Sequence, residues 1–102
     1  MNIPDQRIYY VIFVTTAYES FDDVQTKAPD LVAAHIARSQ ELSAQGKLFM
    51  AGAFLDNPNE PLSMMAVLTS PEAAEEYIKG DPAYLKGMVR SWHVREWANM
   101  FS

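Results

Sequence analysis

The feature that most limits the fold is Ile8–Val14 (IYYVIFV), a run in which every side chain is β-branched or aromatic. A half-buried strand alternates polar and apolar side chains, whereas this run is apolar in both alternating sets. Such a pattern is typical of a central strand that is covered on both faces. The run is far shorter than the roughly 20 residues that cross a bilayer. We therefore predict a central strand and no membrane segment.

A long helix is predicted after this strand. Thr15–Gln25 is polar and irregular, and we interpret it as a loop. Thr26 is the expected N-cap of the helix, and Pro29 stands in the first turn, where a missing backbone N–H costs little. Gly46 is typical of the position just after a helix C-terminus. The helix is thus expected to run from Thr26 to Gly46.

The second half of the chain predicts two strands, two helical segments and a last strand. Ser70 before Pro71 and Asp81 before Pro82 are both typical helix starts, in which a capping side chain precedes a proline. The turn-forming run Asp56–Pro61 separates the two strands. The elements expected are strands over 47–54 and 62–68, helices from Ser70 to Gly80 and from Asp81 to near Gly87, and a strand over 88–97.

The order of these elements is strand, helix, strand, strand, helix, strand. In one domain of 102 residues, this βαββαβ order predicts an α+β ferredoxin-like sandwich, a four-stranded antiparallel sheet with helices on one face. The other sheet face would be bare, although Ile8–Val14 is apolar on both faces. A second copy of the chain is the simplest cover, so we expect a homodimer through the open sheet face.

Composition and charge exclude several classes of function. The chain has 8 Lys and Arg against 13 Asp and Glu, a formal net charge of −5, and its cations are scattered, so nucleic acid is not an expected partner. The absence of Cys excludes disulfides, thiolate nucleophiles and Cys-ligated zinc. The four Gly are isolated, which excludes a phosphate-binding glycine loop. No signal-peptide pattern is present at the start of the sequence, and we expect a cytoplasmic protein without a cofactor.

Two ionisable residues are candidates for catalysis. His35 lies four residues after Leu31 and seven before Leu42, on the apolar stripe that should face the sheet. It is either a general base or a structural histidine that donates to a backbone carbonyl. Asp81 is a helix cap, and one of its carboxylate oxygens could also bind an imidazole. These interpretations of Asp81 are compatible.

Other candidates are weaker. Four aromatic residues flank the expected cleft and suit a planar apolar ligand, although each could equally anchor a loop: Tyr18, Phe21, Phe54 and Tyr84. His93, on the last strand, is interpreted as structural or as part of a dimer interface. Neither H-x-x-x-H nor H-E-x-x-H occurs, so no metal site is expected.

Several short motifs together resemble the YciI-like family. They are IYYVIFV, H-x-x-R at His35 and Arg38, G-K-L-x-x-x-G over 46–52, the S-P-E-A-A helix start, and Asp81-Pro82. The resemblance covers nearly the whole chain and implies a dimeric α/β barrel of ferredoxin-like subunits, related in shape to muconolactone isomerases and cofactor-free monooxygenases. It also implies a His–Asp pair at the active site, here His35 and Asp81, and lyase-like chemistry such as removal of chloride from a hydroxylated, chlorinated ring.

These observations lead to a first hypothesis, a small cofactor-independent lyase or isomerase. His35 would take a proton from a hydroxylated or carbonyl-bearing ring compound, and Asp81 would orient the imidazole. Ser63 would bind the substrate oxygen, with Arg38 and Tyr84 as further substrate-binding residues. One alternative is a non-catalytic dimeric ligand-binding or accessory module, and another is an oxygen-using monooxygenase on the same barrel.

Overall fold

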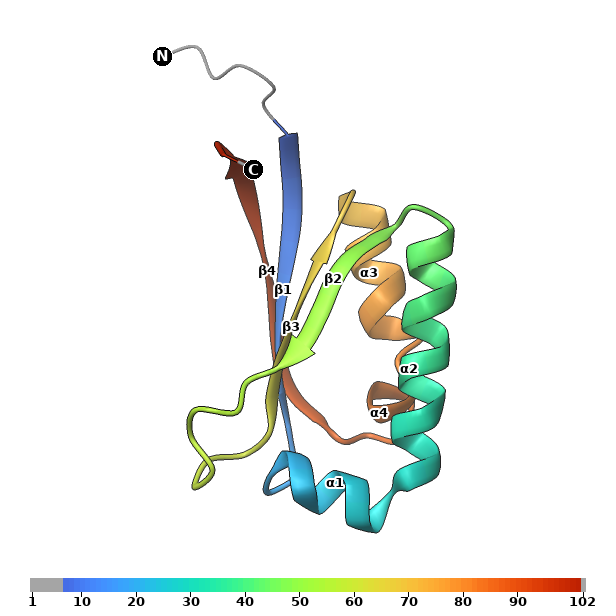
Figure 1. Cartoon of the computed structure of the whole chain (residues 1–102), viewed down its shortest axis with the longest axis vertical. Helices are drawn as coiled ribbons and strands as arrows, with labels where there is room; N and C mark the ends of the chain where they lie inside the picture. Colours follow the sequence, from blue (N-terminus) through green and yellow to red (C-terminus); the bar gives the residue numbers. More distant parts are fainter. Residues whose placement is uncertain (1–6, 102) are drawn as a thin grey trace.

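The computed structural model describes residues 7–101, which form a four-stranded antiparallel sheet with helices on one face (Figure 1). The strand order is β2-β3-β1-β4, and each pair of neighbours is antiparallel. The predicted ferredoxin-like βαββαβ fold is confirmed. The elements are β1 (Arg7–Thr16), α1 (Phe21–Lys27), α2 (Pro29–Ala44), β2 (Leu48–Ala53), β3 (Ser63–Leu68), α3 (Pro71–Lys79), α4 (Pro82–Leu85) and β4 (Val89–Asn99).

Strand β1 lies between β3 and β4 and is covered as its sequence predicts. On the helix side, Ile12 and Val14 pack in the main core with α3. On the opposite face, Tyr9 and Val11 form a smaller cluster with Val67 of β3. Because β1 buries apolar area on both faces, it is the strand against which β3, β4 and the helix layer pack, and β2 joins the sheet through β3.

The predicted loop over 15–25 is wrong in its second half, because α1 begins at Phe21. The Ser20 side chain caps this helix by accepting from the backbone N–H of Asp23 at 3.0 Å. Asp23 also forms an ion pair with Lys27, four residues later, at 2.8 Å. Val24 is the one buried residue of α1, so the helix has no apolar stripe that a periodicity argument could detect.

The predicted N-cap of the long helix is also wrong. Thr26 lies inside α1, and α2 begins at Pro29 after Ala28, which has no capping side-chain hydrogen bond. Pro29 can start a new helix there, because the first helical position needs no N–H partner. The C-terminal signal is confirmed, since Gly46 has a φ of 75° just beyond α2.

The predicted caps of the second half are confirmed. The Ser70 hydroxyl accepts from the N–H of Ala73 at 3.0 Å and starts α3. The Asp81 carboxylate accepts from the N–H of Ala83 at 3.0 Å and starts α4. Both helices therefore begin where the capping residue and the proline predict, which fixes the backbone of Asp81 at the junction of α3 and α4.

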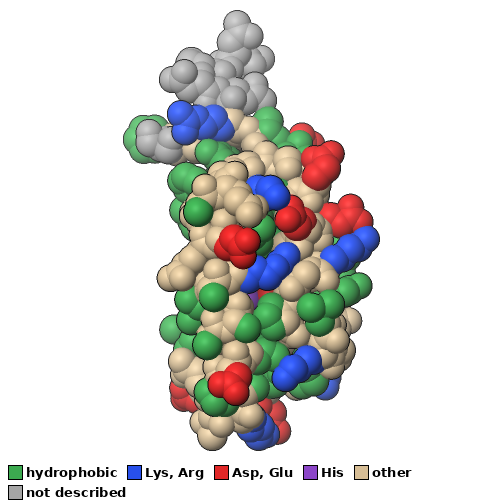
Figure 2. Space-filling model, turned by 90° about the vertical axis from the view of Figure 1, so that its right-hand side faces the viewer, with side chains coloured by type: hydrophobic (Ala, Val, Ile, Leu, Met, Phe, Trp, Pro, Cys, Tyr) green, Lys and Arg blue, Asp and Glu red, His purple; other side chains and the backbone are tan. Residues whose placement is uncertain are grey.

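The two faces of the sheet differ in cover. Helices α2 and α3 lie over one face, and none of the helices between residues 7 and 101 lies over the other (Figure 1). On the helix side, acidic, basic and hydrophobic side chains are interspersed, with no large area of one charge (Figure 2). No helix within 7–101 combines the length and the apolar character that crossing a membrane requires.

Candidate functional site

His35 and Asp81, which are 46 residues apart in sequence, meet between α2 and the start of α4. His35 Nδ1 lies 2.5 Å from Asp81 Oδ1. The Asp81 side chain is buried, whereas the His35 side chain keeps 22% of its surface exposed. The second Asp81 oxygen, Oδ2, accepts from the N–H of Ala83. Asp81 is therefore a helix cap and an imidazole partner at the same time.

This hydrogen bond determines what the imidazole can do. An ionised carboxylate only accepts, so Nδ1 carries the proton and donates it to Asp81. In a neutral His35 ring, Nε2 then holds the free lone pair. Nε2 has no hydrogen-bond partner among the described residues. The arrangement thus gives one fixed tautomer with an unoccupied basic nitrogen, which can accept a proton from a bound molecule.

Tyr77 of α3 lies beside the pair. Its ring meets the His35 ring edge to face, with centroids 6.2 Å apart. Burial raises the pKa of Tyr77, and the negative charge of Asp81 raises it further. Tyr77 therefore stays an uncharged phenol next to the pair, and it adds no competing charge to the carboxylate.

The His35 ring lies between two spaces. A cavity of about 50 Å³, which otherwise has a mainly apolar lining, borders both His35 and Asp81. A larger groove of about 510 Å³ between α2 and β2 borders His35 but does not touch Asp81. The Nδ1 edge of the ring is turned to Asp81, and His35 borders both spaces. This α2–β2 groove has a volume typical of small-molecule sites.

Arg38 lies one turn after His35 but faces α3. Its guanidinium donates to the backbone carbonyl of Tyr77 at 2.7 Å and to that of Glu76. It lies against Gly80, where any Cβ would collide with it. Arg38 therefore ties α2 to the C-terminal end of α3, directly before Asp81.

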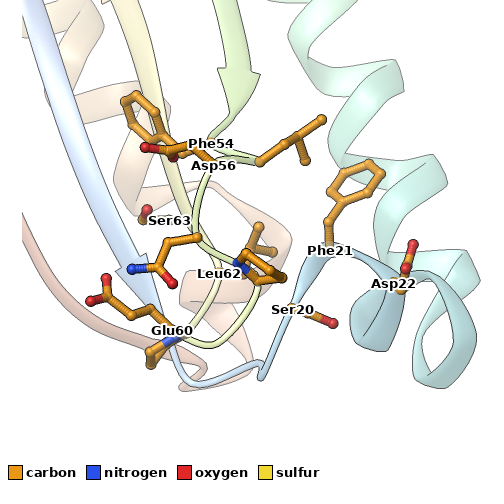
Figure 3. A pocket seen from close by; sticks show the side chains of 12 residues that line it. Ser20, Phe21, Asp22, Phe54, Asp56, Glu60, Leu62 and Ser63 are labelled. Carbon is orange, nitrogen blue, oxygen red and sulfur yellow. The ribbon is translucent and has the colours of Figure 1, made fainter.

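The other two predicted substrate-binding residues lie away from the groove. Ser63 lines a separate cavity of about 560 Å³ between the start of α1 and the β2–β3 loop (Figure 3). Neither His35 nor Asp81 borders this loop cavity. Tyr84 lies on α4 with a partly exposed side chain, and it is not part of the lining of the groove.

The remaining candidates from the sequence are distributed over the molecule. Phe21 borders both the groove and the loop cavity, whereas Phe54 borders only the loop cavity of these two. Tyr18 is buried in a small core cluster. His93 stacks on Phe13 on the open sheet face, with ring centroids 5.1 Å apart. Within residues 7–101, no three His, Asp or Glu side chains converge as metal ligands do.

Sequence reasoning missed two residues near the pair. Tyr77 was not distinguished from an ordinary core residue of α3, because its contact with His35 depends on how α2 crosses α3. Ser39 lines the groove one helical turn after His35. Its spacing of four residues from His35 was the available signal, since residues i and i+4 share a helix face.

Comparisons with known proteins identify the family and the fold of this chain. The family model of the YCII-related domain matches residues 8–98. The chain is similar in structure to 5-chloro-2-hydroxyhydroquinone dehydrochlorinase (TftG) from Burkholderia phenoliruptrix in complex with 2,5-dihydroxybenzoquinone, with a TM-score of 0.61 and 18% identity over 87% of this chain and 92% of that chain.

Two further solved structures are similar. Rv0793 from Mycobacterium tuberculosis has a TM-score of 0.53 and 18% identity, over 93% of this chain and 97% of that chain. Protein SO0527 from Shewanella oneidensis has a TM-score of 0.52 and 15% identity, over 99% and 98%. No curated protein matches the chain. At these identities the structural matches establish the fold, and they confirm the predicted one.

The buried phenol predicts a difference in alkaline stability. Above pH 10 the unfolded chain ionises Tyr77 while the folded chain does not, because burial raises the folded pKa. The free energy of unfolding should therefore fall as the pH rises, with a slope through this group that approaches about 1.4 kcal/mol per pH unit well above pH 10. Tyr77→Phe removes this contribution, so denaturant unfolding between pH 9 and 11 should give a shallower fall. Equal slopes in the two proteins would contradict the burial argument.

Proposed function

Because this chain belongs to the YCII-related family, we propose that it is a cofactor-independent enzyme of lyase or isomerase type. Its general base is His35, and Asp81 orients the imidazole. The observation that carries the proposal is the 2.5 Å contact between His35 Nδ1 and Asp81 Oδ1, in a residue that also borders the α2–β2 groove. This is the geometry that a proton-abstracting imidazole needs.

The proton transfer follows from this arrangement. His35 Nε2 takes a proton from a hydroxyl or an activated C–H of a ring compound in the groove. The imidazolium that forms lies against the Asp81 carboxylate, which stabilises its positive charge in a buried setting. The electron pair left on the substrate moves into the ring. A ring carbon then takes the proton back from the imidazolium, which gives a keto tautomer, the product of an isomerisation. If that carbon carries a halide, loss of a second hydroxyl proton to His35 Nε2 expels the halide with its bonding pair and leaves a quinone.

The substrate class is a hydroxylated or carbonyl-bearing ring. The groove is lined by apolar side chains from Phe21, Met64 and β2, which suit a planar ring. The name of TftG, a dehydrochlorinase that acts on a chlorinated, hydroxylated ring, favours the same class. Arg38 supports the site as a positioning residue, because it fixes the end of α3 directly before Asp81.

The enzyme is proposed to work as a homodimer through the open sheet face. This face carries a buried cluster of Tyr9, Val11 and Val67 beside two large exposed side chains, Phe49 and Trp97. Exposed apolar area of this kind is typical of an interface. Phe49 and Met50 of the edge strand β2 border both this face and the α2–β2 groove, so a partner on the open face would lie next to the groove.

A second candidate function is a non-catalytic ligand-binding or accessory module. One observation favours it: Asp81 forms two hydrogen bonds, one that caps α4 and one that holds α2 through His35. In that case the pair serves only to join helices. The two functions predict different effects on turnover when the basic nitrogen of His35 is removed and the hydrogen bond to Asp81 is kept.

The first prediction separates these functions with two variants of His35. The amide of His35→Asn can donate to Asp81 from the place of Nδ1, but it has no base in the place of Nε2. We expect turnover to fall by at least about 100-fold, with stability kept within about 1 kcal/mol. His35→Ala should lose turnover and also about 1–3 kcal/mol of stability, because Asp81 loses a buried partner.

The assay uses 5-chloro-2-hydroxyhydroquinone without oxygen, which excludes monooxygenase chemistry. Chloride release reports elimination, and deuterium uptake from D₂O into the recovered ring reports proton transfer. If the wild-type protein shows neither chloride release nor deuterium uptake, the enzyme proposal is contradicted. Full turnover by His35→Asn would also contradict it. Loss of stability in His35→Ala with no activity in any variant favours the accessory module.

The second prediction concerns assembly. Sedimentation equilibrium at micromolar concentration should give the mass of two 11.5 kDa chains. Trp97→Glu places a charge on the open sheet face and should yield a monomer, because burying an unpaired charge is costly. Leu85→Glu is the matched control, since Leu85 is more exposed than Trp97 but lies on α4, away from that face. If the wild-type protein has the mass of a single chain, the proposal of a homodimer is overturned.

A further inference from the structure

We propose that the α2–β2 groove binds an uncharged ring compound. An oxygen of this compound forms a hydrogen bond with the Ser39 hydroxyl, and its apolar edge packs on β2 at Ala51. This inference rests on the proposed function and adds the polarity, the orientation and the size limit of the ligand. It names one positioning residue and one specificity-determining residue. Three features of the groove carry it: a polar wall, a shallow apolar wall, and the absence of charged side chains.

The polar wall comes from α2. Ser39 lies four residues after His35, so the two side chains lie on one helix face with Cβ atoms about 5–6 Å apart. Both border the groove. The Ser39 hydroxyl makes no hydrogen bond to another residue in the part of the chain that the structure describes. It is therefore free to bind a ligand oxygen close to the atom that His35 deprotonates.

The apolar wall comes from β2. Ala51 pairs with Ala66 of β3, and directly opposed residues of an antiparallel pair point to the same sheet face. Ala66 is buried in the helix-side core, so the Ala51 methyl also points to the helix side. Unlike Ala66, Ala51 is exposed and borders the groove. Its small side chain keeps the space between β2 and α2 open.

The charge of the lining limits the ligand. Among the described residues that line the groove none is Lys, Arg, Asp or Glu, and His35 is the one ionisable side chain. The guanidinium of Arg38, also on α2, is bound to the α3 carbonyls. A carboxylate or phosphate in this groove would lose its hydration without gaining a lysine or arginine partner, which is costly. The groove thus favours an uncharged phenol over an acid of the same shape.

The experiment compares 4-chlorocatechol with 3,4-dihydroxybenzoate under oxygen-free conditions. The two probes share a ring with adjacent hydroxyls and differ in a chlorine or a carboxylate at one position. Binding is followed by ¹H–¹⁵N NMR titration at pH 7, which gives the Kd and the residues whose amide signals shift. We expect 4-chlorocatechol to bind at least about tenfold more tightly, because only the acid must be buried as a charge. Its shifts should concentrate in α2 and β2.

Variants test the two named residues. Ser39→Ala should weaken 4-chlorocatechol by about three- to tenfold, the usual effect of one lost hydrogen bond. Ala51→Leu should weaken it at least about tenfold, because the larger side chain fills the groove. Ala37→Leu is the matched control for size, since Ala37 is an exposed residue of α2 outside the groove lining. Ser63→Ala tests the rival placement in the loop cavity.

Every result decides the inference. The groove is supported if Ser39→Ala and Ala51→Leu weaken binding while Ala37→Leu and Ser63→Ala do not. It is overturned if 4-chlorocatechol does not bind, if the acid binds as tightly, if shifts centre on the loop cavity, or if Ser63→Ala has the larger effect. These binding results are independent of turnover. If His35→Asn loses activity while Ser39→Ala and Ala51→Leu bind normally, the inference about the groove fails and the proposed function stands. If Ser39→Ala and Ala51→Leu weaken binding while His35→Asn keeps full activity, the groove binds the ligand but the proposed catalysis fails.

Discussion

The burial of β1 on both faces is the constraint on which the rest of the structure depends. Ile12 points to the helices and Val11 to the opposite face, and both are buried. Neighbouring strands and the helix layer therefore have to form around this strand. The helix layer brings α2 over the sheet, so that His35 meets Asp81 across 46 residues of sequence. The site is thus a consequence of how the central strand is covered.

At this site one carboxylate performs two tasks. Asp81 holds α4 through one oxygen and the His35 ring through the other. A buried carboxylate is costly unless it is paired, and these two bonds supply the pairing. The same bond to Nδ1 leaves Nε2 without a partner among the described residues. The contact that stabilises the helix junction is therefore also the one that prepares the imidazole to accept a proton.

Much of this could be predicted from the sequence because the signals were local. The strand at Ile8–Val14 and the caps at Ser70 and Asp81 each depend on neighbouring residues, and the structure agrees with them. The contact of Asp81 with His35 joins residues 46 apart in sequence, and the family resemblance, not a local pattern, implied it. Helix α1 was missed because it buries one side chain and is held by its cap and an ion pair. The groove could not be predicted, since its walls come from α2 and from an edge strand whose register no local pattern specifies.

The most direct test of the central claim is a ¹⁵N NMR measurement of the His35 ring in the unchanged protein and in Asp81→Asn. In the neutral ring, the account predicts a protonated Nδ1, with a downfield N–H proton, and an unprotonated Nε2. The downfield signal should be lost or moved strongly upfield when Asp81 is replaced. A ring protonated at Nε2, or one whose signals ignore the substitution, would contradict the account, because the pair would then leave no free base at the groove.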